Sequence, residues 1–272
     1  MGYQLLDSGY QNKLERVGDY LLVRPSSQAI WRPLLNQNQW KEDAAFSRNP
    51  SPQWSSSSIP RSWTITFKEL LFKIVLTDFG HIGVFPEQAS LWEWMSSRIE
   101  KKSSILNLFA YTGGATLMAL KQGARVCHVE ASKATLSWAR ENISINHCDP
   151  TQVRWILDDV MRFLKREIKR GVKYEGIILD PPTFGRGSRG EVFKIEKDLP
   201  EILDLACQLL SSSARFLILS SHTPGYTPLL LHHLLSQSTL LASLKGTLEW
   251  GEMVVPGPLD LTAGSYATWS SI

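Results

Sequence analysis

Four stretches of the sequence have residue types that could bind or activate a ligand, and each follows a short apolar run. The first contains the paired glycines Gly113 and Gly114 at the start of an expected helix. Adjacent glycines let the backbone approach a ligand closely and expose N–H groups that suit a carboxylate or a phosphate. By itself this pattern is explained equally well as an ordinary glycine-rich turn between a strand and a helix.

Acidic residues end the next two apolar runs. Glu130 could accept hydrogen bonds from both hydroxyls of a ribose. Asp158 and Asp159 could accept from an adenine amine, although an acidic residue at this place also serves as the N-cap of the following helix. Three successive strand ends of this kind indicate a nucleoside ligand.

The fourth apolar run, GIIL, is followed by Asp180, Pro181, Pro182, Thr183 and Phe184. Two prolines stiffen the backbone and leave its carbonyl oxygens without competing N–H donors nearby. Asp180 and the Pro181 carbonyl could therefore orient the lone pair of an amine at a reacting centre. Phe184 could stack on a base, and an ordinary core ring is the alternative.

Alternating strands and helices must position these residues, and from about residue 88 the sequence predicts them in turn. Apolar runs without alternation are typical of parallel strands covered by helices on both faces. Ligands of such a sheet bind beyond the carboxyl ends of the strands, where the strand order reverses. Two final strands have no helix between them, so one of them must run antiparallel to the rest. The expected strands lie at 104–109, 125–130, 153–157, 176–179, 214–220, 248–255 and 265–270, and the helices at 89–98, 115–122, 133–145, 159–170, 197–210 and 228–240.

The sequence thus predicts an α/β fold in three parts. Residues 1–62 form a small β-rich extension, with a strand expected at 20–23 and a Ser/Pro-rich loop or linker at 47–62. Residues 63–87 begin with a β-hairpin, because apolar residues alternate on both sides of Lys68 and Glu69. The main domain covers 88–272.

The composition agrees with a globular chain. Its 272 residues are 43% hydrophobic and 20% charged, which excludes a disordered or collagen-like protein. No run reaches the roughly 18 apolar residues of a membrane span, and residues 1–10 lack the pattern of a signal peptide, so a cytoplasmic protein is expected. Cys127, Cys148 and Cys207 are widely spaced and predict reduced thiols without a metal site.

Basic residues are concentrated near the fourth stretch. The net charge of the chain is +3, whereas residues 161–197 contain ten basic and five acidic residues. Those on the helix at 159–170 are expected to form a solvated face opposite its buried stripe. Arg186, Arg189 and Lys194 follow Phe184, and we expect them to contact the phosphates of a nucleic acid; for Lys194 an ion pair or a helix-end role is the alternative. His222, after the fifth strand, could act as a base, or it could simply pack or face the solvent.

Several motifs together resemble those of class I S-adenosylmethionine-dependent methyltransferases. The runs are NLFAYTGGAT, RVCHVE, LDDV and, above all, DPPTF. They are most similar to the group that modifies large-subunit ribosomal RNA at cytosine C5 or guanine N7, and the likeness covers about residues 63–225. It implies a Rossmann-like, seven-stranded, mostly parallel sheet whose last strand is antiparallel. The implied cofactor is S-adenosyl-L-methionine, and the implied partner is ribosomal RNA.

The resemblance also implies roles for particular residues. Glu130 would bind the ribose, and Asp159, with Asp158 adjacent, would bind the adenine. The methyl-transfer centre would be formed by Asp180 to Pro182, and Gln88 matches a glutamine of the lead-in segment near the cofactor. The residues that would line the methionine part are Phe109, Ala110, Tyr111, Thr112, Gly113 and Gly114.

One departure from that group changes the expected chemistry. The cytosine-C5 enzymes carry a cysteine after the fifth strand, whereas here residues 219–223 read LSSHT. We therefore predict direct in-line methylation of a base nitrogen without a cysteine adduct. A non-catalytic RNA-binding or ribosome-assembly factor and a methyltransferase of a non-RNA acceptor remain alternatives, while a nicotinamide-dependent oxidoreductase is disfavoured because G-x-G-x-x-G is absent. The sequence leaves the acceptor atom and the oligomeric state open.

Overall fold

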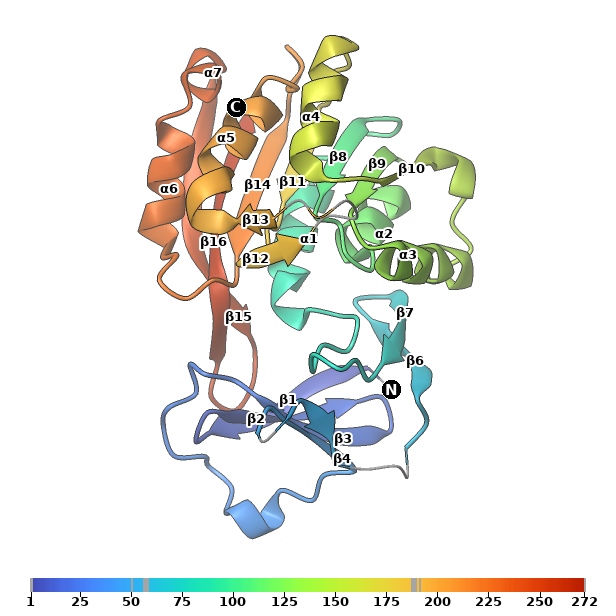
Figure 1. Ribbon diagram of the computed structural model, residues 1–272, viewed down its shortest axis with the longest axis vertical. Coiled ribbons are helices and arrows are strands. Elements are labelled where there is room, and N and C mark those ends of the chain that lie inside the picture. Colours follow the sequence, from blue (N-terminus) through green and yellow to red (C-terminus); the bar gives the residue numbers. More distant parts are fainter. Residues whose placement is uncertain (1, 50, 56–58, 187–189, 191, 272) are drawn as a thin grey trace. The chain divides into compact units, whose positions relative to one another are not determined.

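Buried parallel strands and the helices that cover them build the larger part of the computed structural model, which describes residues 2–49, 51–55, 59–186, 190 and 192–271. The chain divides into two units, one of Met1–Ala89 with Val254–Ala263 and one of Ser90–Met253 with Gly264–Ile272 (Figure 1). The side chains of Gln37 and Arg186 also lie outside the description.

The second unit contains a seven-stranded sheet in the order β10-β9-β8-β11-β14-β16-β15 (Figure 1). Neighbouring strands from β10 to β14 are parallel, and β16 runs antiparallel to β14. The prediction of a mostly parallel sheet with an antiparallel last strand is therefore confirmed. The strands are β8 (Ser104–Leu108), β9 (Arg125–Glu130), β10 (Val153–Leu157), β11 (Gly176–Leu179), β14 (Phe216–Ser221), β15 (Gly246–Val255) and β16 (Leu261–Ser271).

Helices cover both faces of this sheet, as alternate strand residues show. Leu106 and Leu108 of β8 face a buried cluster that includes Phe163, Leu203 and Leu231 from α4, α5 and α6. Asn107, between those leucines, faces the other way and bonds to Thr116 of α2. The helices are α1 (Ala89–Ser96), α2 (Gly114–Lys121), α3 (Lys133–Ile145), α4 (Val160–Lys169), α5 (Ile195–Cys207), α6 (Pro228–Ser236) and α7 (Thr239–Ser243), and η3 (Pro150–Gln152) is a 3-10 turn.

One local prediction in this unit was wrong. The single helix expected at 228–240 is two helices, because Ser238 restarts the chain as the N-cap of α7 and accepts a hydrogen bond from the Leu241 N–H at 3.3 Å. Phe184 begins an antiparallel hairpin of β12 (Phe184–Arg186) and β13 (Val192–Lys194), which the sequence did not predict. Among the described residues, no helix is long and apolar enough to cross a membrane.

The first unit confirms the β-rich N-terminal extension. A five-stranded sheet runs in the order β1-β2-β3-β4-β5, and β6 and β7 form the expected hairpin. Lys68 and Glu69 connect them with φ angles of 51° and 61°, a left-handed pair typical of a tight hairpin turn. The elements are β1 (Tyr3–Gly9), β2 (Asn12–Val17), β3 (Tyr20–Pro25), β4 (Ala44–Ser47), β5 (Gln53–Trp54), β6 (Ser62–Phe67), β7 (Leu70–Val75), and the 3-10 turns η1 (Gln37–Gln39) and η2 (Pro86–Gln88).

Strand β5 lies inside the Ser/Pro-rich stretch that was expected to be a loop. Trp54 is the reason, because its ring packs on Phe46 with centroids 5.3 Å apart and its indole N–H donates to the Thr77 carbonyl at 2.9 Å. Trp54 thus gives β5 an apolar contact, and Ile59 of the same stretch is buried as well.

Buried charge also shapes this first unit. Glu15 lies 2.6 Å from the Arg24 guanidinium and accepts a hydrogen bond from Tyr3. Burial works against its ionisation, yet Arg24 and Lys13 hold the pKa of Glu15 at about 2. The pair is fully bonded, as a buried ion pair must be.

Candidate functional site

The strand order reverses between β8 and β11, so the carboxyl ends of these two strands mark the switch point of the sheet. The chain runs from β8 to β9 and β10 on one side, and β11 and β14 lie on the other. The predicted loop 109–114 follows β8, Glu130 ends β9 and Asp180 follows β11. The fold therefore brings these predicted residues to one edge of the sheet.

The loop after β8 has an unusual backbone. Phe109 and Tyr111 have φ angles of 55° and 49°, and Gly113 has 87°. Left-handed conformations in residues with a Cβ store strain, which typically concentrates at ligand sites. The Ala110 N–H donates to the Val129 carbonyl at 3.1 Å, which ties the loop to β9.

Glu130 makes the second tie between this loop and β9. Its Oε2 accepts from the Tyr111 N–H at 3.0 Å and its Oε1 accepts from the Ser132 N–H at 2.8 Å. Burial raises the pKa of Glu130, against the lowering effect of the bonds from Ser132 and Tyr111. The carboxylate is thus a nearly buried acceptor placed directly beside the loop.

The two glycines of the loop are required for different structural reasons. Gly113 adopts the left-handed backbone that Gly tolerates without cost. A Cβ at Gly114 would lie 2.4 Å from the Trp92 ring of α1, so Gly114 is required by packing. The backbone conformation of the loop therefore requires a glycine at position 113 but not at position 114.

Buried polar side chains beneath the loop form hydrogen bonds that the sequence did not predict. Asn107 donates to Thr116 Oγ1 at 3.0 Å, and that oxygen lies 2.9 Å from His128 Nδ1. Asn142 of α3 donates to the Thr112 carbonyl at 2.9 Å. The signal in the sequence was polar residues, Asn107 and His128, inside otherwise apolar strands.

His128 predicts a pH dependence of stability. Burial lowers its pKa to about 3 from an ordinary value of 6.5. The folded state therefore holds the neutral ring, and its contribution to stability is present above pH 6.5 and is lost as the pH falls toward 3, by up to about 1.4 kcal/mol per pH unit. In urea unfolding, His128→Gln is expected to flatten this part of the profile, and the exposed control His147→Gln is expected to keep it. Equal slopes in His128→Gln and the wild type would contradict the prediction.

The adjacent acids after β10 have distinct partners. Asp159 is the N-cap of α4 and accepts from the Arg162 N–H at 2.9 Å. Asp158 is buried and pairs with the guanidinium groups of Arg162 and Arg166. Although burial opposes it, these arginines lower the pKa of Asp158. Asp159 is therefore the N-cap of the helix, as the alternative interpretation expected. The binding of adenine by Asp158 and Asp159 stays a prediction.

Asp180 meets β14 at the other side of the switch point. Its Oδ1 accepts from Ser220 Oγ at 2.7 Å, and His222 Nδ1 lies 3.5 Å from the same oxygen. Thr183 pairs with Thr223 at 2.9 Å, which ties the segment after Pro182 to the end of β14. Phe184 is 50% exposed and is therefore no core ring.

The β12–β13 hairpin has two different faces. In its register Gly185 lies opposite Phe193, and Phe184 lies opposite Lys194, so Phe193 points away from the other two side chains. The Phe193 ring packs on Phe109 with centroids 5.3 Å apart. The hairpin therefore covers the start of the loop with one face and exposes Phe184 and Lys194 on the other.

The predicted basic contacts are described only in part. Lys194 is exposed, and its backbone N–H donates to the Asp198 carboxylate at the start of α5 at 2.7 Å. The side chain of Arg186 and the whole of Arg189 lie outside the described residues.

The sequence matches the family model of the S-adenosylmethionine-dependent methyltransferases over residues 11–236. The chain belongs to this family. The methyltransferase is also similar over its full length to the crystal structure of a SAM-dependent methyltransferase from Agrobacterium tumefaciens, with 35% identity, 91% of that chain covered and a TM-score of 0.93. SMU.776 in complex with S-adenosylhomocysteine (SAH) shares the fold at 20% identity, with 96% of this chain and 71% of that chain covered and a TM-score of 0.76.

A curated relative matches about half of the methyltransferase. It is "Ribosomal RNA large subunit methyltransferase K/L" of Syntrophotalea carbinolica, 37% identical over 142 residues. The match covers 52% of this chain and 19% of the relative. The chain therefore spans about a fifth of that protein's length.

Family membership confirms the predicted enzyme class and cofactor, S-adenosylmethionine. The residues at the switch point fit this group chemically. Glu130 offers carboxylate oxygens suited to ribose hydroxyls, and the loop 109–114 offers a backbone without a side chain at Gly113. Gln88, the remaining predicted cofactor residue, is buried in η2 of the first unit.

The three cysteines of the methyltransferase are poor nucleophiles. Cys127 and Cys207 are buried, and burial raises the pKa of each to about 11. Burial also raises the pKa of Cys148, which lies after α3. A thiolate mechanism at neutral pH is therefore disfavoured for all of them.

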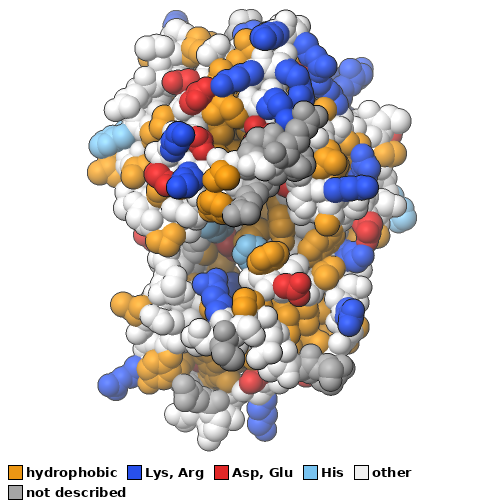
Figure 2. All heavy atoms as spheres, in the orientation of Figure 1, with side chains coloured by type: hydrophobic (Ala, Val, Ile, Leu, Met, Phe, Trp, Pro, Cys, Tyr) orange, Lys and Arg blue, Asp and Glu red, His pale blue; other side chains and the backbone are white. Residues whose placement is uncertain are grey.

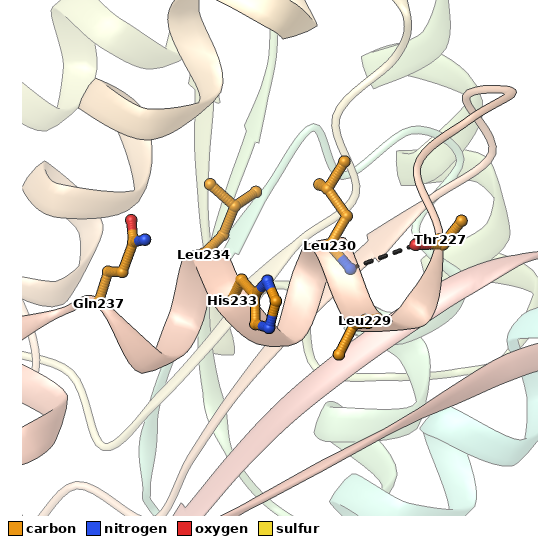
Figure 3. Close-up of a pocket in the computed structure, with 6 residues that line it drawn as sticks. All are labelled: Thr227, Leu229, Leu230, His233, Leu234 and Gln237. Carbon is orange, nitrogen blue, oxygen red and sulfur yellow. Dashed lines mark hydrogen bonds between the residues drawn. The ribbon is translucent and has the colours of Figure 1, made fainter.

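Two surface features lie apart from the switch point. Lys and Arg side chains gather over α4 in Figure 2, and several of them are paired with acids, as Lys165 is with Glu201 at 2.7 Å. A pocket of about 390 Å³ on α6 includes an exposed imidazole and no carboxylate (Figure 3). Its lining is Thr227, Leu229, Leu230, His233, Leu234 and Gln237.

Phe193 predicts a cofactor-binding effect that the sequence did not suggest. Phe193→Ala removes the ring that packs on Phe109 and is expected to raise the Kd of SAH about 3- to 10-fold, as loss of an aromatic pair does. Val192→Ala is the matched control, because this half-exposed neighbour lies on the other face of the hairpin. Isothermal calorimetry measures both, and equal Kd values for the two variants would contradict the prediction.

Proposed function

We propose that this methyltransferase methylates a nitrogen of an RNA base, and that its substrate is ribosomal RNA. The observation that carries the proposal is the arrangement at the carboxyl ends of β11 and β14. Asp180 is followed by two prolines, and the side chains beside it are a serine and a histidine rather than a thiol. The name of the curated relative supports RNA as the substrate class.

Each residue at the switch point has a separate role in the in-line transfer of the methyl group. When bound, S-adenosylmethionine supplies an electrophilic methyl group. Asp180 and the Pro181 carbonyl accept hydrogen bonds from an amine and turn its lone pair toward that methyl group. Phe184, half exposed on the outer face of the hairpin, stacks on the acceptor base, and Glu130 holds the ribose.

Basic residues after Phe184 supply the contacts to RNA phosphates in this proposal. Arg186→Ala combined with Arg189→Ala is expected to weaken RNA binding and to reduce the slope of log K against log salt by roughly one per lost contact, or about two. Filter binding at several salt concentrations measures both quantities. An unchanged slope would remove these arginines from the interface.

Transfer of a labelled methyl group tests the function itself. The enzyme is incubated with labelled S-adenosylmethionine and undermethylated ribosomal RNA or ribosomes, and the product is digested to nucleosides. An N-methylated base is the expected product. C5-methylcytidine would overturn the proposed chemistry, and RNA binding without transfer would favour an assembly factor.

A further inference from the structure

Two side chains contact Asp180, one from Ser220 near the end of β14 and one from His222 just after that strand. Ser220 Oγ donates to Asp180 Oδ1 at 2.7 Å, and His222 Nδ1 lies 3.5 Å from that oxygen. Ser220 is 1% exposed, whereas the side chains of His222 and Asp180 are 30% and 27% exposed. One oxygen of the carboxylate is therefore held from the interior by a hydroxyl and from the rim by an imidazole.

The strand register, not a loop, places Ser220 beside Asp180. Strands β11 and β14 are parallel neighbours, and Leu179 pairs with Leu219. The next residues along the chain are Asp180, which directly follows β11, and Ser220, which is still paired within β14, so the two lie side by side. Their contact is as fixed as the sheet itself.

The two prolines restrict the backbone but do not fix the orientation of the Asp180 carboxylate, which its side-chain contacts must hold. Pro181 and Pro182 restrict the backbone, whereas the carboxylate of Asp180 can still turn about its own side-chain bonds. A displacement of about 1 Å at a reacting centre costs roughly 100-fold in rate. A charge-assisted bond from a buried hydroxyl is short and directional, so it can hold that orientation.

We propose that Ser220 and His222 are positioning residues, which orient Asp180 toward the amine of the acceptor base. With its proton on Nδ1, His222 gives the second donor to Oδ1. In this protein the residues at the end of β14, near the place where the cytosine-C5 enzymes carry their cysteine, thus orient the Asp180 carboxylate. This inference rests on the proposed function, because the acceptor amine is part of it.

Single variants with matched controls test the roles of both residues. Ser220→Ala and His222→Leu are each expected to lower kcat roughly tenfold, while KM for S-adenosylmethionine and the Kd of SAH stay within about twofold. His222→Asn, whose amide nitrogen can take the place of Nδ1, is expected to recover most of the loss. Ser221→Ala is the control, since that hydroxyl accepts from the Thr223 N–H at 3.2 Å.

A double-mutant cycle separates positioning from general support of the fold. In an Asp180→Asn background, Ser220→Ala is expected to have little further effect on kcat. A full tenfold loss in that background, or unchanged kcat in both single variants, overturns the proposal.

A crystal structure of the Ser220→Ala enzyme with SAH gives a readout that does not depend on the substrate. A rotated Asp180 carboxylate in this variant supports the positioning role, whether or not the enzyme methylates RNA. A failure to methylate any RNA base would contradict the proposed function but not the positioning role. An unmoved carboxylate overturns the positioning role and leaves the proposed function standing.

Discussion

Asp180→Ala is expected to lower kcat for methyl transfer roughly 100-fold or more, while the Kd of SAH changes by less than about tenfold. The carboxylate stands at the carboxyl end of β11, at the switch point of the sheet, and is held by Ser220. Its loss removes the acceptor that orients the amine, whereas most of the cofactor contacts expected at the loop 109–114 and Glu130 remain. The effect therefore belongs to the chemical step.

Two further variants make this expectation sharp. Asp180→Asn keeps one acceptor oxygen and the shape of the side chain, so a smaller loss is expected than for alanine. Asp204→Ala removes an exposed carboxylate of α5 and should leave kcat unchanged. Single-turnover rates with saturating S-adenosylmethionine provide the measurement. A variant Asp180→Ala with wild-type kcat would exclude the residue from the reacting centre.

The sheet was predictable because its central strands are buried on both faces. Runs such as GIIL, which becomes β11, and FLIL, which begins β14, are apolar without interruption, and helices follow most of the expected strands. This pattern predicts both the parallel sheet and the edge of the sheet at which Glu130 and Asp180 lie. The helix expected at 228–240 was misread because leucines stand on both sides of Ser238, whose capping bond depends on local geometry.

Most of the first unit was not predictable in the same way. Glu15 and Asp7 look like solvent-facing residues in the sequence, yet both are buried. Asp7 accepts from the Leu34 and Leu35 N–H groups and from the Trp40 indole, all far along the chain. A polar residue whose partners are distant in sequence hides the alternation that would reveal a strand.

The supporting residues of the site were missed for a related reason. Strand ends could be inspected one by one, but the contact of Ser220 with Asp180 requires the register between β11 and β14. Phe193 requires a hairpin that a glycine-rich composition concealed. The sequence therefore indicated the residues at strand ends, and the structure was needed for those that act across strands.

Glu130→Ala is expected to raise the Kd of SAH about 100-fold. Two hydroxyls of a ribose donating to a carboxylate contribute roughly 1.5 kcal/mol each, and the variant also frees the Tyr111 and Ser132 N–H groups that Glu130 now binds. Glu201→Ala, at an exposed carboxylate of α5, is the matched control. Calorimetry with SAH compares the two, and an unchanged Kd in Glu130→Ala would place the ribose elsewhere.

The raised pKa of Glu130 adds a pH dependence whose sign follows from burial. In the protein without cofactor, the fold disfavours the ionised carboxylate, so the contribution of Glu130 to stability is present below its ordinary pKa of 4.5 and is lost as the pH rises through the folded value. Ribose hydroxyls favour the ionised form, so SAH affinity should fall as the pH falls through that value, and binding there should release protons. Calorimetry in buffers of different ionisation enthalpy measures this release. It should disappear in Glu130→Gln, and equal release in that variant would assign the proton to another group.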